Sequence, residues 1–232
     1  MYIEINGIPV EIRKKNIKNM HLYVQPPNGK VWISAPLNLS DENIVLFVQS
    51  KIEWIKKHQE KMKNQPRQTK LQYVSGESFY VLGKQYYLQV DYSCTENSLI
   101  LSGDKALLTV HKESSIKQRE KFVREWYRSI LKSEIDKHLP KWEQKTGLYC
   151  NSWQTKYMTT RWGTCNTKTK KLWFNLQLAK KPIECIEYII LHEIAHLKVK
   201  NHGNAFIAIL DSYMPCWREI KKKLNEQVLD YI

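Results

Sequence analysis

Residues 182–206, PIECIEYIILHEIAHLKVKNHGNAF, constrain the fold of this chain more than any other segment. Pro182 suits the first turn of a helix, and the apolar residues that follow it are too numerous for a single face. The segment therefore predicts a mostly buried helix that extends to about Lys200. Such a helix needs further elements packed around it, and 232 residues are enough to build that core.

Histidines in this segment have the spacing of metal ligands. His192 and His196 are four residues apart, so their imidazoles project from one helix face and reach one ion at ~2.0–2.1 Å. A catalytic site usually needs a third protein ligand. His202 is the candidate, because Asn201 and Gly203 allow the chain to reverse after the helix. Imidazole ligands favour zinc, so the sequence predicts one Zn²⁺ per chain.

Glu193 completes an HExxH motif and has a different expected role. It lies ~100° around the helix from His192, where its carboxylate reaches a metal-activated water without being a ligand itself. In that role Glu193 is the general base, while the zinc polarises the attacked carbonyl. The natural reaction of this set is hydrolysis of a peptide bond, and the expected substrate is a peptide or protein.

The rest of the sequence predicts an α+β fold. Short segments of alternating apolar and polar residues recur before residue 115 and indicate strands, and residues 41–62 carry the apolar stripe of a helix. The pattern changes at Ser115, where a long helix begins. We therefore expect a β-rich N-terminal half with one helix, residues 1–115, and a catalytic half, residues 116–232, with a small sheet and the HExxH helix. No internal repeat is evident.

The net charge and the cysteine content indicate which partners and which cellular compartment to expect. The net charge is +14, and most of the excess lies after residue 115, so the basic surface is a possible contact for nucleic acid or nucleotides. Five scattered cysteines without a CxxC pair fit reduced thiols. No stretch approaches the ~18–20 apolar residues that cross a bilayer, and the N-terminus does not look like a signal peptide. We expect a cytoplasmic protein without a membrane partner.

Two motifs, RWGTCN and LHEIAHLKVKNHGNAF, resemble those of the YgjP-like metallopeptidase family, which is related to SprT-like and minigluzincin-type zinc peptidases. The resemblance covers most of the chain, including SAPLNLSDENIVLFVQSKIEWIKKH and GESFYVLGKQYYLQV in the N-terminal half. It implies that residues 116–232 are a zincin-like domain in which His202 is the third ligand. Thr164 stands where the family's RWGSC motif has serine and keeps a hydroxyl group.

Residues around RWGTCN are candidates for substrate binding. Arg161 would lie near the metal and bind a substrate carboxylate or phosphate, or the oxyanion. The alternative is that Trp162-Gly163 is only a turn packed by an aromatic ring. The segment LWFNLQL is a candidate edge strand for pairing with an extended peptide. Trp173 or Phe174 would then line the substrate pocket, although packing in the core is an equal alternative.

Two other functions fit the same residues. The basic charge and Arg161 permit a metal-dependent nucleotide pyrophosphohydrolase. In the other alternative the zinc is structural, in a module that binds nucleic acid or protein, and Cys165 is the fourth ligand. An open metal position beside a strand edge favours the peptidase. Several Lys or Arg side chains converging on the metal favour the nucleotide hydrolase, and four protein ligands favour the structural site.

Overall fold

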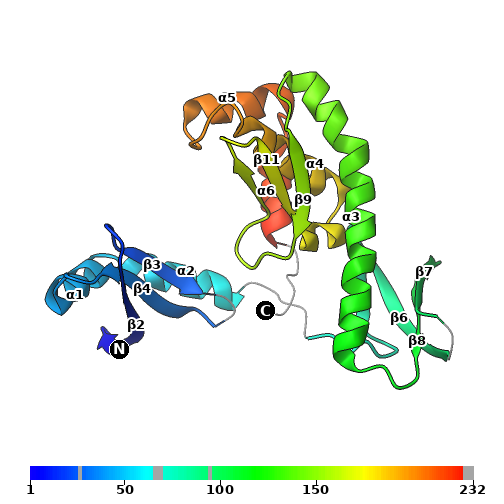
Figure 1. Ribbon diagram of the computed structural model, residues 1–232, viewed down its shortest axis with the longest axis horizontal. Coiled ribbons are helices and arrows are strands. Elements are labelled where there is room, and N and C mark those ends of the chain that lie inside the picture. The colour runs from blue at the N-terminus through cyan, green and yellow to red at the C-terminus, as the bar shows by residue number, and fades with distance from the viewer. Residues whose placement is uncertain (26–27, 65–69, 94–95, 227–232) are drawn as a thin grey trace. The chain divides into compact units, whose positions relative to one another are not determined.

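The computed structural model describes residues 1–25, 28–64, 70–93 and 96–226. It divides the chain into two compact units, residues 1–67 and residues 68–230. Both units mix helices with small sheets, which confirms the predicted α+β class (Figure 1). No helix among the described residues is long and apolar enough to cross a membrane.

The first unit is one sheet covered by two helices. Its strands lie in the order β1-β2-β4-β3, in which β2 and β4 are parallel and the outer pairs antiparallel. The helix expected over residues 41–62 is broken at Lys51, and the Ser40 side chain caps its start by accepting from the Asn43 N–H. The elements are β1 (Tyr2–Ile5), β2 (Ile8–Lys15), β3 (His21–Gln25), β4 (Lys30–Pro36), α1 (Asp41–Ser50) and α2 (Ile52–Asn64).

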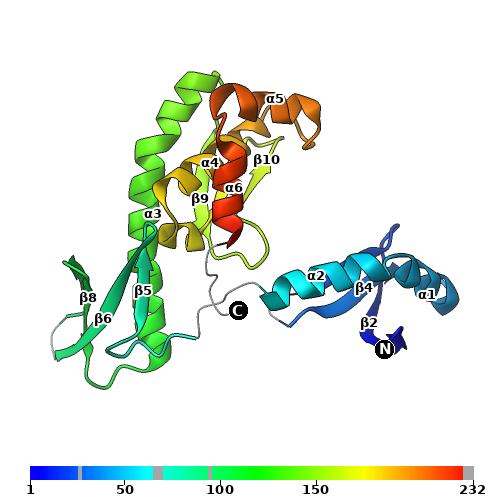
Figure 2. The ribbon, with the colours of Figure 1, turned by 180° about the vertical axis from the view of Figure 1, so that it is seen from behind.

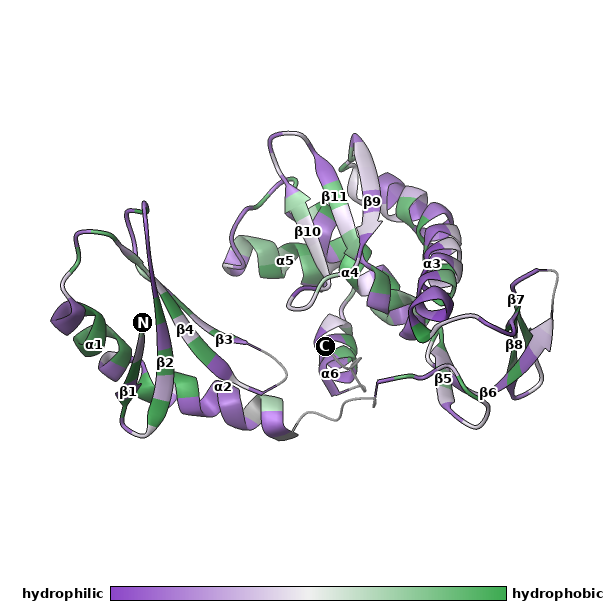
Figure 3. Cartoon of the chain, turned by 60° about the horizontal axis from the view of Figure 1, so that its bottom comes forward, coloured by the Kyte–Doolittle hydropathy of each residue, from purple (hydrophilic) through white to green (hydrophobic). Residues whose placement is uncertain are grey.

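Alternation along the strands decides which face of this sheet the helices cover. Along β2 every second residue from Ile8 to Ile12 is buried, and Figure 3 shows the matching change between hydrophobic and hydrophilic residues on β2 and β4. The buried residues form a separate core: Ile5, Ile8, Val10, Ile12, Val31, Ile33, Ala35, Ile44, Val48 and Ile55.

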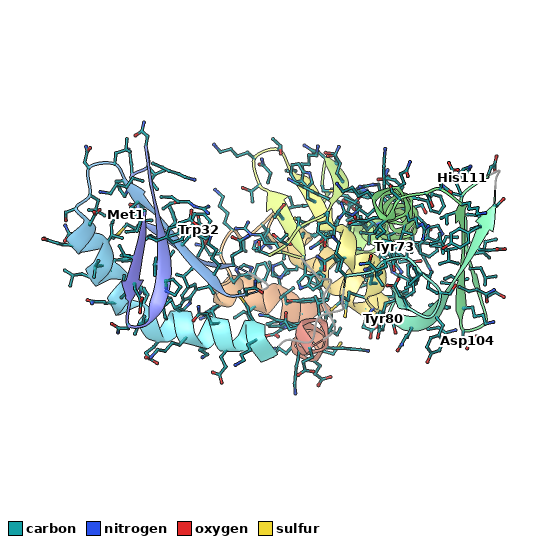
Figure 4. All side chains as sticks on the ribbon, turned by 90° about the horizontal axis from the view of Figure 1, so that it is seen from below. Met1, Trp32, Tyr73, Tyr80, Asp104 and His111 are labelled. Atoms are coloured by element: carbon teal, nitrogen blue, oxygen red, sulfur yellow. The ribbon has the colours of Figure 1, made fainter. Side chains whose placement is uncertain are left out.

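The second unit begins with a sheet of the same topology. Its order is β5-β6-β8-β7, with β6 and β8 parallel and the outer pairs antiparallel. The strand order and directions of the first sheet therefore occur twice, although the sequence shows no evident repeat. Figure 4 labels Asp104, which directly precedes β8, and His111, its last residue. The strands are β5 (Ser78–Val81), β6 (Lys84–Ser93), β7 (Ser98–Ser102) and β8 (Lys105–His111).

A long helix, α3 (Ile116–Thr146), connects this sheet to the remainder of the unit. Its first half packs on the sheet, where the Tyr127 ring stacks on Phe79 and the Tyr127 hydroxyl donates to the Tyr80 carbonyl at 2.8 Å. Its second half extends beyond the sheet (Figure 1), and there His138 Nδ1 lies 2.8 Å from a carboxylate oxygen of Glu187. One helix thus packs on the four-stranded sheet with its first half and on the rest of the unit with its second half.

The second half of α3 carries a three-stranded sheet and the HExxH helix. The strand order is β10-β11-β9, so β11 is central and β10 is an edge strand. Figure 2 shows α6 beside α4, with β10 on the other side of α4. These elements are β9 (Ser152–Lys156), β10 (Gly163–Asn166), β11 (Lys171–Asn175), the 3₁₀ helix η1 (Leu176–Lys180), α4 (Ile183–Ala195), α5 (Asn204–Tyr213) and α6 (Trp217–Glu226).

The compact units do not divide at the predicted boundary, residue 115. That position lies between β8 and α3, inside the second unit. The sheet of β5–β8 shares one hydrophobic core with α3 and α4, and the backbone N–H groups of Leu82 and Gly83 donate to carbonyls of η1 at 2.9 and 3.1 Å. The capping box at Ser115 marks the start of a helix and not the start of a domain.

Candidate active site

The site is built around the end of α4. Most of α4 is buried, including Ile190, Leu191 and Ile194, as expected for an apolar helix enclosed by β10, β11, α3 and α6. His192 and His196 lie one turn apart on its exposed side, with ring centroids 4.9 Å apart. The helix ends at Ala195, earlier than the predicted Lys200, and His196 is its C-terminal cap.

The chain reverses after α4 and returns His202 to the first two histidines. Nε2 of His202 lies 3.0 Å from Nε2 of His192, and each of the three histidines offers a nitrogen within 4.8 Å of the others. Two ligand nitrogens at ~2.0–2.1 Å from one tetrahedral zinc ion would be about 3.3 Å apart. The separation of His192 and His202 matches that of two ligands of one ion, and the His196 nitrogen lies within 4.8 Å of both.

Burial and hydrogen bonding prepare these imidazoles for a cation. Burial, followed by the neighbouring charges of His196, His202 and Lys221, lowers the pKa of His192 to about 3. Burial also lowers the pKa of His196, so both rings are neutral at pH 7. Nδ1 of His196 lies 3.1 Å from the Val199 carbonyl and donates to it, which leaves Nε2 as the atom with a free lone pair. Neutral imidazoles of this kind are zinc ligands.

Glu193 lies beneath the histidines and is only 4 % exposed. Burial raises the pKa of its carboxyl to about 8, and the positive charge of Arg161 opposes that rise. The carboxylate packs directly on the backbone of Gly163 in β10. A Cβ atom at position 163 would lie 2.5 Å from Glu193 Oε1 and 2.7 Å from its Cγ. Any other residue at position 163 would displace the Glu193 side chain. This contact explains why the RWGTC motif has glycine at this position.

These groups line one cavity of about 720 Å³. Its walls come from β10 and the segment before it, from α4 and the segment after it, and from α6. Arg161, Lys200 and Lys221 line it, and Glu193 is the one acidic residue among its described lining residues. The cavity therefore combines a metal-binding histidine cluster with excess positive charge. Its lining residues are Arg161, Trp162, Gly163, Thr164, Cys165, Thr167, Tyr188, Ile189, His192, Glu193, His196, Lys200, His202, Lys221, Leu224 and Asn225.

Trp173 is not among the residues that line the cavity, contrary to the prediction. Leu172 and Phe174 are buried on one face of β11, so alternation directs Trp173 to the opposite face. There the Lys171 ammonium lies 4.8 Å from its ring centroid. The predicted edge strand is also misplaced, because β11 is central and β10 is the edge strand beside the cavity. Trp162 is the tryptophan that lines the cavity, and Phe174 is not among the lining residues either.

Cys165 lines the cavity but does not join the histidine cluster. The group of potential ligand atoms within 4.8 Å of one another contains the three histidines alone, among the residues that the structure describes. Burial, and then the charge of Glu193, raises the pKa of the Cys165 thiol to about 11, so it is not poised as a thiolate ligand. This arrangement does not favour a closed structural zinc site.

Among known protein families, one has a model that matches most of this chain. The family model of the YgjP-like metallopeptidase domain matches residues 18–227 of the chain. The chain belongs to the YgjP-like metallopeptidase family. The predicted family resemblance and the assignment as a hydrolase of the peptidase class are thereby confirmed. Among curated proteins no significant match was found.

Two solved structures resemble part of this YgjP-like chain. Both are metallopeptidase zymogens. Jannalysin from Methanocaldococcus jannaschii has 28 % identity and a TM-score of 0.35, over 39 % of this chain and 92 % of its own. Abylysin from Pyrococcus abyssi has 18 % identity and a TM-score of 0.37, over 39 % of this chain and 90 % of its own.

Several cavity residues of this YgjP-like chain were not predicted from its sequence. Tyr188 is one turn before His192, so the same helical spacing that links the histidines could have found it. Lys200 and Lys221 had no signal, since lysine is frequent throughout the chain and α6 reaches α4 only through the tertiary fold. Gly163 was recognised as part of a motif, but its contact with Glu193 needed the structure.

Proposed function

We propose that this metallopeptidase is a zinc enzyme with one Zn²⁺ per chain, held by His192, His196 and His202, and that Glu193 is its general base. The observation that carries the proposal is the meeting of three imidazole nitrogens beside a buried carboxylate. Three histidines leave a tetrahedral ion one open position, as catalytic zinc sites do.

Zinc in this place would supply a Lewis acid that polarises a peptide carbonyl and makes a water molecule more acidic. Glu193 would take the proton from that water and deliver it to the departing amine nitrogen. A divalent cation beside Glu193 favours its ionised form, which offsets the rise in pKa that burial causes. The Glu193 side chain packs against the backbone of Gly163, and this contact would restrict the positions that the carboxylate can take.

The edge of β10 is the proposed binding place for the substrate backbone. Within the described residues β10 pairs with β11 on one side only, and Gly163, Thr164 and Cys165 of β10 line the cavity. An extended peptide can add to such an edge through main-chain hydrogen bonds, which holds its backbone without specifying its sequence. Arg161, just before β10, would contact the developing oxyanion or a substrate carboxylate.

Hydrolysis of a casein-type unfolded substrate by zinc-loaded protein tests the proposal. Glu193→Gln should retain zinc and lose activity by about 10²–10⁴-fold, because the positioned base is removed while the ligands stay. Glu219→Gln is the matched control, since Glu219 is an exposed residue of α6 outside the cavity. Activity that survives in Glu193→Gln, or is absent from the zinc-loaded wild type, would refute it.

A nucleotide pyrophosphohydrolase is the second candidate. The observation in its favour is that Arg161, Lys200 and Lys221 line the histidine cavity, where they would meet phosphate oxygens. Release of pyrophosphate or phosphate from a nucleoside triphosphate, measured on the same wild-type and Glu193→Gln samples, separates the two. Nucleotide turnover without peptide turnover would replace the peptidase proposal.

We also propose that the protein works in a reducing compartment such as the cytoplasm. Cys150, Cys165, Cys185 and Cys216 all have free thiols, and burial raises the pKa of Cys150 and Cys185 to about 12 and 11. Such thiols do not need an oxidising environment. Fractionation of cells that produce the protein should place it with cytoplasmic markers, and recovery from a secreted fraction would contradict this.

A further inference from the structure

Three cationic side chains converge on the cavity from separate segments. Arg161 precedes β10, Lys200 follows α4, and Lys221 lies on α6. Because these segments are distant in sequence, the fold itself brings the charges together. Among the described lining residues Glu193 is the one that carries a carboxylate, and its side chain is buried. Before any metal binds, the described wall therefore has more positive than negative charge.

The backbone segments that carry two of these cations are anchored by buried residues. Asn175, 3 % exposed, donates from Nδ2 to the Arg161 carbonyl at 2.7 Å, and its own N–H donates to the Trp162 carbonyl at 2.8 Å. Lys221 follows Ile220, which is buried together with Leu224 where α6 packs on α4. Both side chains line the same cavity as Glu193 and His192.

The cavity cations differ from the other basic residues of α6 in their ion pairing. Arg218 pairs with Asp211, Lys223 with Glu184, and Lys222 lies 3.9 Å from Glu226. Within the described parts of the chain, no carboxylate lies within ion-pair distance of Lys221, nor of Arg161 or Lys200. The basic residues of α6 are therefore paired except the one that faces the cavity.

We infer that the cleft selects peptides that carry a carboxylate beside the scissile bond, which Arg161, Lys200 and Lys221 bind. This inference rests on the proposed peptidase function and names the substrate class for the same cavity. The carboxylate has two possible sources, the C-terminus of the peptide or an Asp or Glu side chain. A neutral peptide would offer these exposed cations no charged partner, whereas a carboxylate accepts charge-assisted hydrogen bonds from them.

Four peptides of one sequence separate the two sources of the carboxylate. They combine Glu or Gln at the residue next to the cleaved bond with a free or amidated C-terminus. Wild type should cleave the preferred carboxylate form with a kcat/KM about tenfold or more above its neutral partner, mainly through KM. A preference for the free C-terminus assigns the cations to an exopeptidase site, and a preference for Glu assigns them to a side-chain pocket.

Charge-removing variants then connect the preference to these residues. Arg161→Gln and Lys221→Gln should bring the ratio between carboxylate and neutral peptides towards one. Lys222→Gln and Lys198→Gln are the matched controls, because both lysines are exposed and neither lines the cavity. Equal kcat/KM for all four peptides, or a preference that persists in both cavity variants, would overturn the inference.

A binding measurement separates failure of this inference from failure of the peptidase proposal. Neutral peptides cleaved as well as acidic ones, with the activity lost in Glu193→Gln, would keep the peptidase and overturn the carboxylate preference. In calorimetry, N-acetyl-glutamate should bind wild type at least about tenfold more tightly than N-acetyl-glutamine amide, whether or not any peptide is cleaved. Tight binding of a nucleoside triphosphate without that difference would assign the cations to phosphate and overturn the inference.

Discussion

The two four-stranded sheets of this protein have the same strand order and directions, but they support different structures. In residues 1–67 the sheet is covered by α1 and α2 and forms a core of its own. In residues 68–230 the equivalent sheet is covered by α3, which has 31 residues and extends beyond it. The three-stranded sheet, α4 and the cavity are built on that extension.

This difference shows how a unit of sheet and helix can support further elements when its helix is longer than the sheet. In the first module α1 and α2 cover the sheet and complete a core of its own. A longer helix in the second module offers a second packing surface, on which Arg128 donates to the Thr155 carbonyl of β9 at 3.1 Å and His138 contacts Glu187 of α4. The histidine cavity is lined by β10, α4, α6 and the segments beside them, which lie outside the four-stranded sheet.

The helix-free faces of the two sheets differ as well. In the first sheet the cross-strand neighbours Tyr2, Glu11, Trp32 and Tyr23 form one row, and the Trp32 and Tyr23 rings stack at 3.9 Å. In the second sheet this face includes the exposed side chains of Tyr87 and Ile100. The repeated topology therefore does not repeat the surface chemistry.

The largest predicted effect tests whether the two units, each with its own hydrophobic core, unfold separately. Leu131→Ala in α3 and Ile33→Ala in β4 each remove a fully buried side chain, at a cost of about 2–5 kcal/mol in the free energy of unfolding. If the units unfold separately, Ile33→Ala lowers only one thermal transition and leaves metal binding intact, whereas Leu131→Ala lowers the other and weakens metal binding. Calorimetry with and without zinc measures both, and one shared transition would contradict separate units.

A substitution at Gly163 affects only the elements added to α3. An alanine Cβ would displace the Glu193 carboxylate, and a shift of ~1 Å in a catalytic group can reduce the rate by about 10²-fold. We expect Gly163→Ala to lose about that much kcat while it retains zinc. Gly203→Ala is the control, because a Cβ there meets nothing within 4 Å. Wild-type kcat in Gly163→Ala would show that the contact does not position Glu193.

The smallest predicted effect concerns the helix-free face of the first sheet. Hydrogen bonds from Arg13 and then Lys30 lower the pKa of the Glu11 carboxyl from 4.5 to about 2. A lowered pKa means that this carboxylate stabilises the fold above about pH 4.5 and loses that contribution as the pH falls towards 2. An NMR titration should show the low pKa, and Glu11→Gln should reduce the loss of stability as the pH falls through this window. A pKa near 4.5 would contradict the pairing.

Local sequence patterns predicted much of the site but not its surroundings. The four-residue spacing of His192 and His196, and the turn-forming residues around His202, specify positions that depend on a single helix and its end. Trp173 is not among the residues that line the cavity, and strand periodicity could not have shown this, because it gives two faces without saying which one meets α4. Lys221 reaches the cavity only through tertiary packing of α6.

The larger organisation was also beyond local patterns. Strands before residue 115 were predicted, but the parallel pairing of β2 with β4 and of β6 with β8 depends on contacts across intervening segments. The repeat is therefore visible in strand order and not in residue identity. The predicted boundary at residue 115 coincides with the start of α3, which is a local signal, whereas the packing of α3 on the preceding sheet is not.

Zinc content measured by elemental analysis tests the central claim most directly, on wild type, His202→Ala and the control His21→Ala, whose histidine is exposed in β3 of the first unit. The account predicts about one zinc per chain in wild type and His21→Ala, and little in His202→Ala because two histidines hold the ion poorly. A wild-type protein that cannot be loaded with zinc, or a His202→Ala variant that binds it as tightly, would contradict the three-histidine site.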